Sequence, residues 1–275
     1  MKERVTITLD NSLINDLDNL VDGVKIRNRS HAIEFLLRKS LTLKKPRKAL
    51  ILAGGKGTRL RPITYEIPKP MVPVQGRPLI EHTISLLRKY DIRDIMVSVG
   101  YLGEKVKEYF GDGKKFGVNI KYIFEDEPLG TAGCLRLARE WLDEPFIMFN
   151  GDNLVNIDLE GLFDFHMRNK GQATIALTTV DDPSSFGVAI LKGGVITNFV
   201  EKPKTPISKL INAGVYVIEP EVVNLVPDGT ASMEYDVFPK ILEKEKLRGY
   251  PFEGQWLPTD NTERYEKAIR EWRGV

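Results

Sequence analysis

The apolar residues between positions 48 and 150 follow two alternating patterns. The segments KALILA, DIMVSV, NIKYIF and PFIMFN are short and nearly continuous in apolar residues, which is typical of strands buried on both faces. Between them, PLIEHTISLLRKY and TAGCLRLAREWL repeat their apolar residues every three or four positions, as helices with one buried face do. Strands that alternate with helices predict an α/β fold with a doubly wound, mostly parallel sheet.

The segments FGVAIL and VITNFVEK, farther along the chain, are joined by a Lys-Gly-Gly turn. A turn of this kind between two strand patterns predicts a hairpin. We therefore expect a smaller second region, rich in β structure, across roughly residues 173–255.

The first residues of the chain show a different pattern. In ERVTITLD, apolar and polar residues alternate with a period of two, which predicts a strand with one apolar and one polar face. The apolar positions are Val5, Ile7 and Leu9, and the polar positions are Arg4, Thr6 and Thr8. Two helices should follow, the first capped near Asp10 or Ser12 and the second capped by Ser30, with Gly23 between them. So short a strand-helix-helix segment needs a second copy to pair its strand and bury its apolar face.

Composition sets outer limits on the fold. The chain has 275 residues, of which 42% are hydrophobic and 28% charged, and this allows about two domains. We expect boundaries at 1–46 and 47–275. The sequence has no run of roughly 18 apolar residues, and its charged start lacks the apolar stretch of a secretory signal, so a cytoplasmic protein is expected. The only cysteine, Cys134, excludes an internal disulfide and a cysteine zinc cluster, and we expect it to be buried.

The net charge of +2 conceals an uneven distribution. Residues 1–48 carry 11 Lys and Arg against 6 Asp and Glu, a net charge of +5, which leaves 29 against 32, or −3, for the rest of the chain. A basic N-terminal segment favours an anionic partner such as nucleic acid.

Residues 2–43 resemble the ribbon-helix-helix family of DNA-binding proteins, through KERVTITLD and NRS. The resemblance implies that the strands of two chains pair antiparallel in a dimer and lie in the major groove. Arg4, Thr6 and Thr8 would then face the bases. The alternative is that the segment only dimerises the protein and that its basic residues are solvated.

The first predicted strand of the larger domain runs into the loop LAGGKGTRLRPITYEIPKPMVPV. The loop is not a Walker A motif, because the Gly-Lys-Ser/Thr ending is absent, and it lacks the third glycine of the dinucleotide fingerprint. Glycines nevertheless let backbone N–H groups approach an anion, and Arg59 offers a planar fork that matches phosphate oxygens. The loop therefore predicts a polyphosphate site, although glycines alone could simply form a tight turn. It should lie at the same sheet edge as NGDN, because both follow strands at their carboxyl ends.

The same loop, together with EPLGTAG, NGDN, FGVA, FVEKP and INAGVYV, resembles the signature of sugar-1-phosphate nucleotidyltransferases across residues 48–273. The resemblance implies an enzyme that joins a nucleoside triphosphate to a hexose 1-phosphate and releases pyrophosphate. Such a reaction needs positioning and charge stabilisation rather than a protein nucleophile. His31, His82 and His166 have no motif around them, and none is assigned a role.

By this resemblance, each predicted role belongs to residues of the matching motifs. Catalysis would fall to Arg59, on the leaving pyrophosphate, and to Lys69, on the α-phosphate. Mg²⁺ would be bound by Asp152 and Asp260, although Asp260 could instead cap the last helix. The nucleotide would be bound by Leu52, Ala53, Gly54, Gly55, Gly57, Thr58, Arg59, Glu125 and Gly130. The sugar phosphate would be bound by Gly187, Glu201, Lys202, Asn212 and Gly214.

The nucleotide and the sugar stay open. EDEPLGTAG and INAGVYV favour guanine and mannose, but glucose-1-phosphate thymidylyl- and uridylyltransferases share most of these motifs. The alternative function is a DNA-binding transcription regulator whose transferase-like body senses a sugar nucleotide. A sensor without turnover would have no need to keep Arg59, Lys69, Asp152 and Asp260 together, so the sequence favours the enzyme.

Overall fold

A computed structural model of the protein describes residues 5–23, 26–42 and 45–275. The chain divides into two compact units, Met1–Lys45 and Pro46–Val275, which we call the N-terminal unit and the C-terminal unit. Within the described ranges, every helix is too short or too polar to cross a bilayer.

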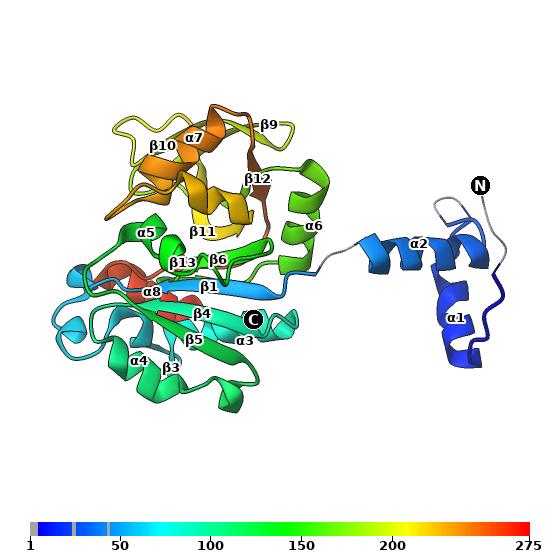
Figure 1. Ribbon diagram of the computed structural model, residues 1–275, viewed down its shortest axis with the longest axis horizontal. Helices are drawn as coiled ribbons and strands as arrows, with labels where there is room; N and C mark the ends of the chain where they lie inside the picture. Colours follow the sequence, from blue (N-terminus) through cyan, green and yellow to red (C-terminus); the bar gives the residue numbers. More distant parts are fainter. Residues whose placement is uncertain (1–4, 24–25, 43–44) are drawn as a thin grey trace. The chain divides into compact units, whose positions relative to one another are not determined.

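The N-terminal unit contains helices α1 (Asn11–Leu20) and α2 (Arg29–Thr42) (Figure 1). Asp10 caps α1 as predicted, because its carboxylate accepts from the backbone N–H of Leu13 at 3.0 Å. The cap predicted at Ser30 is wrong: α2 already includes Ser30, and the Asn28 side chain accepts from the backbone N–H of His31 at 2.9 Å.

Residues 5–10 of the N-terminal unit form no strand in the single chain. Thr6 and Thr8 are exposed, and Arg4 lies outside the described residues. A strand that pairs only across a dimer has no hydrogen-bonding partner in one chain. The ribbon-helix-helix arrangement therefore stays a prediction.

A nine-stranded sheet forms the centre of the C-terminal unit, counted over the described residues. Its order is β5-β4-β1-β6-β11-β8-β12-β10-β9. The first four strands are β5 (Asn119–Phe124), β4 (Asp94–Val99), β1 (Lys48–Ala53) and β6 (Phe146–Asn150). They pair in parallel and confirm the strands predicted from their apolar runs.

The other half of the sheet comprises β11 (Leu210–Ile218), β8 (Ala173–Thr179), β12 (Leu247–Pro251), β10 (Val195–Glu201) and β9 (Gly187–Lys192). Strand β11 is antiparallel to both β6 and β8, and only β12 and β8 pair in parallel here. The predicted hairpin is present as β9 and β10, with Gly193 and Gly194 at φ +55° and +82° in its turn. The smaller β region is thus a continuation of the main sheet, and the mostly parallel pattern holds only for the first half.

Helices cover both faces of this sheet. On one face, α3 (Leu79–Lys89) and α4 (Gly103–Phe110) share a buried apolar cluster with β1, β4 and β6, and α6 (Leu159–Asn169) packs on β8, β11 and β12. On the other, α5 (Gly130–Leu137) and α7 (Phe238–Leu242) pack on the strands (Figure 1). Cys134 of α5 is buried as expected, and burial raises the pKa of its thiol to about 12.

Shorter elements complete the C-terminal unit. The ribbon of β7 (Asn153–Val155) and β13 (Trp256–Pro258) precedes α8 (Thr262–Glu271), and β2 (Pro73–Val74) pairs with β3 (Arg77–Pro78). Pro258 of β13 pairs with Asn153, next to the loop that carries Asp152. This pairing brings the segment before α8 to the carboxyl edge of β1 and β6.

Candidate active site

The carboxyl ends of β1 and β6 are held together by a backbone hydrogen bond. Gly151 donates its N–H to the carbonyl of Leu52 at 2.9 Å. A Cβ at Gly151 would lie 2.3 Å from that carbonyl oxygen, so only glycine fits there. The glycine loop and the NGDN loop therefore begin side by side, as expected for loops that follow neighbouring parallel strands.

Lys69 reaches the same edge from the short 3-10 helix η3 (Lys69–Met71). Its Nζ lies 2.7 Å from Oδ2 of Asp152. The lysine side chain is only 12% exposed, whereas that of Asp152 is 36% exposed. The charged head of Lys69 is thus aimed at the NGDN loop rather than at bulk solvent.

Asp260 lies between two arginines just before α8. Its Oδ2 accepts from Nη1 of Arg59 at 2.7 Å, and its Oδ1 accepts from Nη1 of Arg264 at 2.9 Å. Burial of the Asp260 carboxyl opposes its charge, but Arg264, Arg59 and Lys69 outweigh burial and hold its pKa below the usual value. Asp260 does not cap α8, because the cap is Asn261, whose side chain accepts from the backbone N–H of Arg264.

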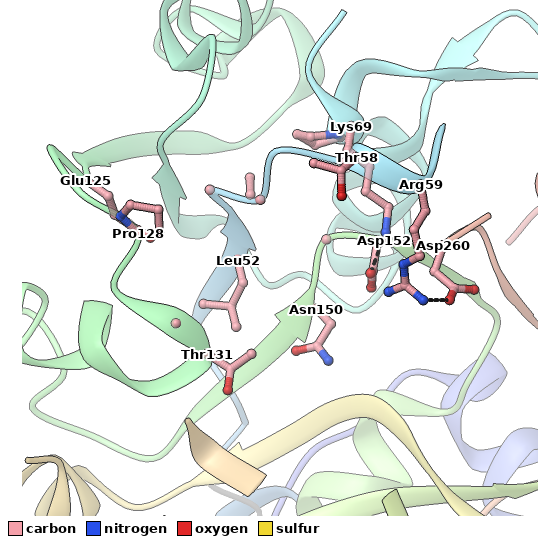
Figure 2. A pocket seen from close by; sticks show the side chains of 17 residues that line it. Leu52, Thr58, Arg59, Lys69, Glu125, Pro128, Thr131, Asn150, Asp152 and Asp260 are labelled. Atoms are coloured by element: carbon pink, nitrogen blue, oxygen red, sulfur yellow. Dashed lines mark hydrogen bonds and ion pairs between the residues drawn. The ribbon is translucent and has the colours of Figure 1, made fainter. Parts of the chain in front are cut away.

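Arg59, Lys69, Asp152 and Asp260 line one cavity of about 360 Å³ (Figure 2). All the residues predicted for catalysis, nucleotide and metal line it: Leu52, Ala53, Gly54, Gly55, Gly57, Thr58, Arg59, Lys69, Glu125, Gly130, Asp152 and Asp260. Sequence reasoning assigned no role to five further lining residues: Pro70, Pro128, Thr131, Asn150 and Gly151. All five lie within the glycine loop segment, EPLGTAG or NGDN, so their place in these motifs is the sequence signal that points to them.

The carboxylate of Glu125 joins two segments of the cavity wall by hydrogen bonds. Its Oε1 accepts from Ser98 Oγ at 2.7 Å, and its Oε2 accepts from the backbone N–H of Leu129 at 3.0 Å. A Cβ on Gly54 would lie 3.0 Å from both carboxylate oxygens. Glu125 thus joins the end of β4 to the loop before α5, and any contact with a base would come in addition.

The residues predicted for the sugar phosphate are not part of the lining of this cavity. Asn212 is 9% exposed, and its side chain contacts Tyr216 OH at 2.9 Å and the N–H of Gly214 at 2.9 Å. Asn150, which lines the cavity, donates to the same Tyr216 hydroxyl at 3.3 Å. Tyr216 therefore connects the cavity to the strand that carries Asn212 and Gly214.

Glu201 and Lys202 form an ion pair of 3.1 Å at the end of β10. The Glu201 side chain is 10% exposed, and that of Lys202 is 56% exposed. Burial raises the pKa of Glu201, Lys202 counteracts this, and the charge of Glu234 adds to the rise. Gly187 lies beside this carboxylate, since a Cβ there would be 2.7 Å from Oε2 of Glu201.

The oxygen donors in the cavity suit magnesium. Mg²⁺ in phosphate-transfer sites takes one or two carboxylates, phosphate oxygens and several waters. Asp152 and Asp260 both line the cavity; Asp152 pairs with Lys69, and Asp260 pairs with Arg59 and Arg264. Among the described residues, no group of three or more His, Cys, Asp or Glu side chains forms a metal cluster. The two carboxylates fit a metal that also needs the nucleotide to complete its ligands.

The fold and this cavity define an α/β protein with a glycine-rich loop that lines a cavity at the carboxyl edge of its sheet. The family model "Nucleotidyl transferase" matches residues 48–273. The chain therefore belongs to the nucleotidyl transferase family, and this part of the sequence resemblance is confirmed.

Curated relatives agree with this family. The chain is 41% identical over 219 residues to a mannose-1-phosphate guanyltransferase of Yarrowia lipolytica, and 41% identical over 220 residues to one of Saccharomyces cerevisiae. Each match covers 76% of this chain and 60% of the relative. The chain thus spans less than two thirds of the length of these relatives.

Solved structures show the same fold. A Bacillus anthracis protein assigned as a glucose-1-phosphate thymidylyltransferase, in complex with sucrose, superposes with a TM-score of 0.77 at 31% identity, over 83% of this chain and 96% of that one. HddC from Yersinia pseudotuberculosis, complexed with GMP-PN, gives a TM-score of 0.70 at 25% identity, over 82% and 99% of the two chains.

Proposed function

We propose that the C-terminal unit transfers a nucleotidyl group from a nucleoside triphosphate to a hexose 1-phosphate, with GTP and mannose 1-phosphate as the preferred pair. The observation that carries the proposal is the convergence of Arg59, Lys69, Asp152 and Asp260 on one glycine-walled cavity. The yeast relatives named as mannose-1-phosphate guanyltransferases support the choice of substrates. The HddC complex with GMP-PN supports a guanine nucleotide.

The reaction follows from the charges around the cavity. An oxygen of the sugar phosphate forms a new bond to the α-phosphorus, while the bond from that phosphorus to the bridging oxygen breaks and pyrophosphate leaves. Negative charge spreads over phosphate oxygens in this displacement, so preorganised cations lower its barrier. Lys69 would stabilise the α-phosphate, and Arg59 with the loop N–H groups would bind the departing phosphates. Bound Mg²⁺, held by Asp152 and Asp260, would add positive charge at the phosphates.

Two ion pairs hold Lys69 and Arg59 near the cavity before a nucleotide binds. Lys69 is kept in the cavity by Asp152, and the exposed Arg59 is kept near it by Asp260. An incoming triphosphate competes for both cations and leaves the carboxylate oxygens available to a metal. On the sugar side, Glu201 would accept from hydroxyls and Lys202 would contact the phosphate, with Gly187, Asn212 and Gly214 shaping that region.

A pyrophosphate-release assay tests this function. Each NTP is combined with glucose, mannose, galactose and N-acetylglucosamine 1-phosphates, with Mg²⁺ or with EDTA. The expected result is Mg²⁺-dependent release, strongest with GTP and mannose 1-phosphate. Strongest release with dTTP or UTP and glucose 1-phosphate would keep the reaction and overturn the substrates. Absence of release with every pair would overturn the reaction and leave the sugar-nucleotide sensor.

For the N-terminal unit we propose pairing with a second copy of the chain and binding of DNA through the paired strands. The observation that favours pairing is its apolar surface, whereas DNA binding is proposed from the family resemblance and from the basic charge of residues 1–48. Leu17 and Ala32 form a small interior, but several large apolar side chains stay exposed. The exposed side chains are Val5, Ile7, Leu13, Leu20, Phe35, Leu36 and Leu37. A second copy could cover such a surface, which a stable monomer rarely shows.

A further inference from the structure

The carboxylate of Asp260 is shared by two arginines that differ in exposure. Arg59 contacts Oδ2 at 2.7 Å with a side chain that is 64% exposed. Arg264 contacts Oδ1 at 2.9 Å with a side chain that is 24% exposed. Only Arg59 lines the cavity, so it can turn to a ligand while Arg264 stays behind the carboxylate.

Arg264 is fixed in place from two sides. Its guanidinium lies 4.6 Å from the ring centroid of Phe186, a cation–π distance. Phe186 packs edge-on against Trp256, with ring centroids 5.3 Å apart, and the Trp256 indole donates to the carbonyl of Ala213 at 2.9 Å. On the backbone side, the N–H of Arg264 donates to the capping side chain of Asn261 at 2.9 Å. The guanidinium is thus held between the Phe186 ring and the Asp260 carboxylate, and the backbone that carries it is fixed in the first turn of α8.

We propose that Arg264 is a positioning residue that orients the carboxylate of Asp260 toward the metal and the nucleotide. The inference rests on the proposed function, because orientation of Asp260 matters only if that carboxylate meets a metal–nucleotide complex. One oxygen of Asp260 is tied to a fixed guanidinium, so the carboxylate cannot rotate when the nucleotide draws Arg59 away. Hydrogen-bond partners of metal-binding carboxylates commonly change metal affinity or activity by about 10–100-fold when they are replaced.

The contacts of Arg264 also link the two predicted substrate regions. Phe186 directly precedes Gly187, and the Trp256 indole contacts Ala213, which lies between Asn212 and Gly214. The strands predicted to meet the sugar thus support the side chain that holds Asp260. Lysine could not replace this arginine fully, since it lacks a planar group that stacks on a ring and donates in its own plane.

The test measures binding without turnover. GTP binding is followed by calorimetry in the absence of sugar phosphate, either in EDTA or over a range of Mg²⁺ concentrations. Arg264→Gln should raise the Mg²⁺ concentration needed for half-maximal binding by about 10–100-fold and leave binding in EDTA unchanged. Arg264→Lys should restore part of the loss. Lys267→Gln is the matched control, because Lys267 follows on the same helix and pairs with Glu271 instead of Asp260.

A second comparison separates positioning from a general structural role. In an Asp260→Asn background, Arg264→Gln should cause no further loss of Mg²⁺-dependent binding, because its effect passes through that carboxylate. A loss of the same size in both backgrounds would overturn the proposal. The proposal would also be overturned if Arg264→Gln alone needed a Mg²⁺ concentration for half-maximal binding within twofold of that of the wild type. If Arg264→Gln does not fold, Arg264→Lys is used for the same comparison. The role of Arg264 alone would be overturned if the wild-type protein turned over substrate but bound GTP without any dependence on Mg²⁺. Absence of all turnover would instead overturn the proposed function.

Discussion

The ammonium group of Lys69 lies 2.7 Å from Oδ2 of Asp152, and both side chains face the cavity at the ends of β1 and β6. Prolines on both sides of Lys69 restrict the backbone that carries it. The lysine is thus held before any nucleotide arrives. Such preorganisation is what makes a cation effective in a transition state, because it needs no rearrangement when charge develops.

Replacement of this lysine should abolish most of the activity. Lys69→Ala is expected to lower the turnover rate by about 100-fold or more and to leave the fold intact, since one preorganised contact contributes several kcal/mol to the transition state. The measurement is pyrophosphate release together with circular dichroism. Lys56→Ala is the matched control, because Lys56 is an exposed lysine of the same loop that does not line the cavity. Equal rates in the Lys69 variant and the wild type would exclude the assigned role.

Two glycines at this edge should respond differently to alanine. Gly151→Ala places a Cβ 2.3 Å from the Leu52 carbonyl and should destabilise the C-terminal unit by about 1–3 kcal/mol. A Cβ at Gly55 would meet no heavy atom within 4 Å, so Gly55→Ala should change stability by less than about 0.5 kcal/mol. Because Gly55 lines the cavity, its alanine variant should still weaken nucleotide binding. Urea unfolding and GTP titration would show the contrast, and unaltered GTP affinity in Gly55→Ala would argue against a phosphate contact there.

The parallel half of the sheet was predictable because its signal is local. The strands around Leu50, Val97 and Met148 are continuous apolar runs, since both of their faces are buried. Strands of a parallel sheet share one carboxyl edge, so the loops after Ala53 and Asn150 had to meet. The meeting of these two loops follows from those facts, whereas the roles of the residues around the cavity, Glu125, Gly130 and Asp260 among them, were implied by the family resemblance.

Other features depend on contacts between distant residues, which leave no local pattern. Arg264 and Phe186 are far apart in the sequence and meet only in the folded chain, and nothing in DNTERY distinguishes Arg264 from a surface arginine. The cap of α8 was also ambiguous, because Asp260 and Asn261 are adjacent and both residue types cap helices. The continuation of β11 into one sheet with β9 and β10 is likewise set by long-range pairing.

Stability of the C-terminal unit should decrease in mild acid because of His82. Its Nδ1 accepts from the Trp272 indole at 3.1 Å, and its Nε2 lies 3.1 Å from the Val74 carbonyl, so the buried ring is held in its neutral form. Burial lowers the pKa of His82 below the ordinary value of 6.5 and Arg77 adds to the decrease, and together they outweigh the hydrogen bond to Val74 and the charge of Glu81, which raise it. The unfolded chain therefore binds this proton more readily, and the stabilisation is complete above pH 6.5 and declines as the pH falls toward the folded pKa.

The measurement is urea unfolding at about pH 7.5, 6.5 and 5.5, followed by tryptophan fluorescence. All three tryptophans, Trp141, Trp256 and Trp272, belong to the C-terminal unit, so this signal reports on that unit alone. His82→Gln should be less stable at the highest pH, but its stability should vary less across the series. Equal pH dependence in the variant and the wild type would show that His82 is not the group responsible.

The two faces of the N-terminal segment should separate dimerisation from DNA binding. Val5 and Ile7 are exposed apolar residues, and Thr6 and Thr8 alternate with them. If two chains pair through this segment, pairing of Ile7→Glu would require burial of the new charge. The variant should therefore be a monomer in light scattering. Thr6→Ala should leave the dimer intact and weaken the choice between DNA sequences, because it removes a polar side chain from the base-facing side.

Salt dependence decides whether the paired segment binds DNA at all. Each phosphate neutralised by a lysine or arginine releases counterions, so the logarithm of DNA affinity should fall linearly with the logarithm of salt concentration. If Arg4 contacts a base rather than a phosphate, Arg4→Ala should reduce the difference in affinity between DNA sequences, in addition to any change in the salt slope. A wild-type dimer that retards no DNA even at low salt, while Ile7→Glu is monomeric, would assign the N-terminal unit to dimerisation alone. Activity that is equal in the monomeric variant and the dimer would then show that each C-terminal unit works independently of the pairing.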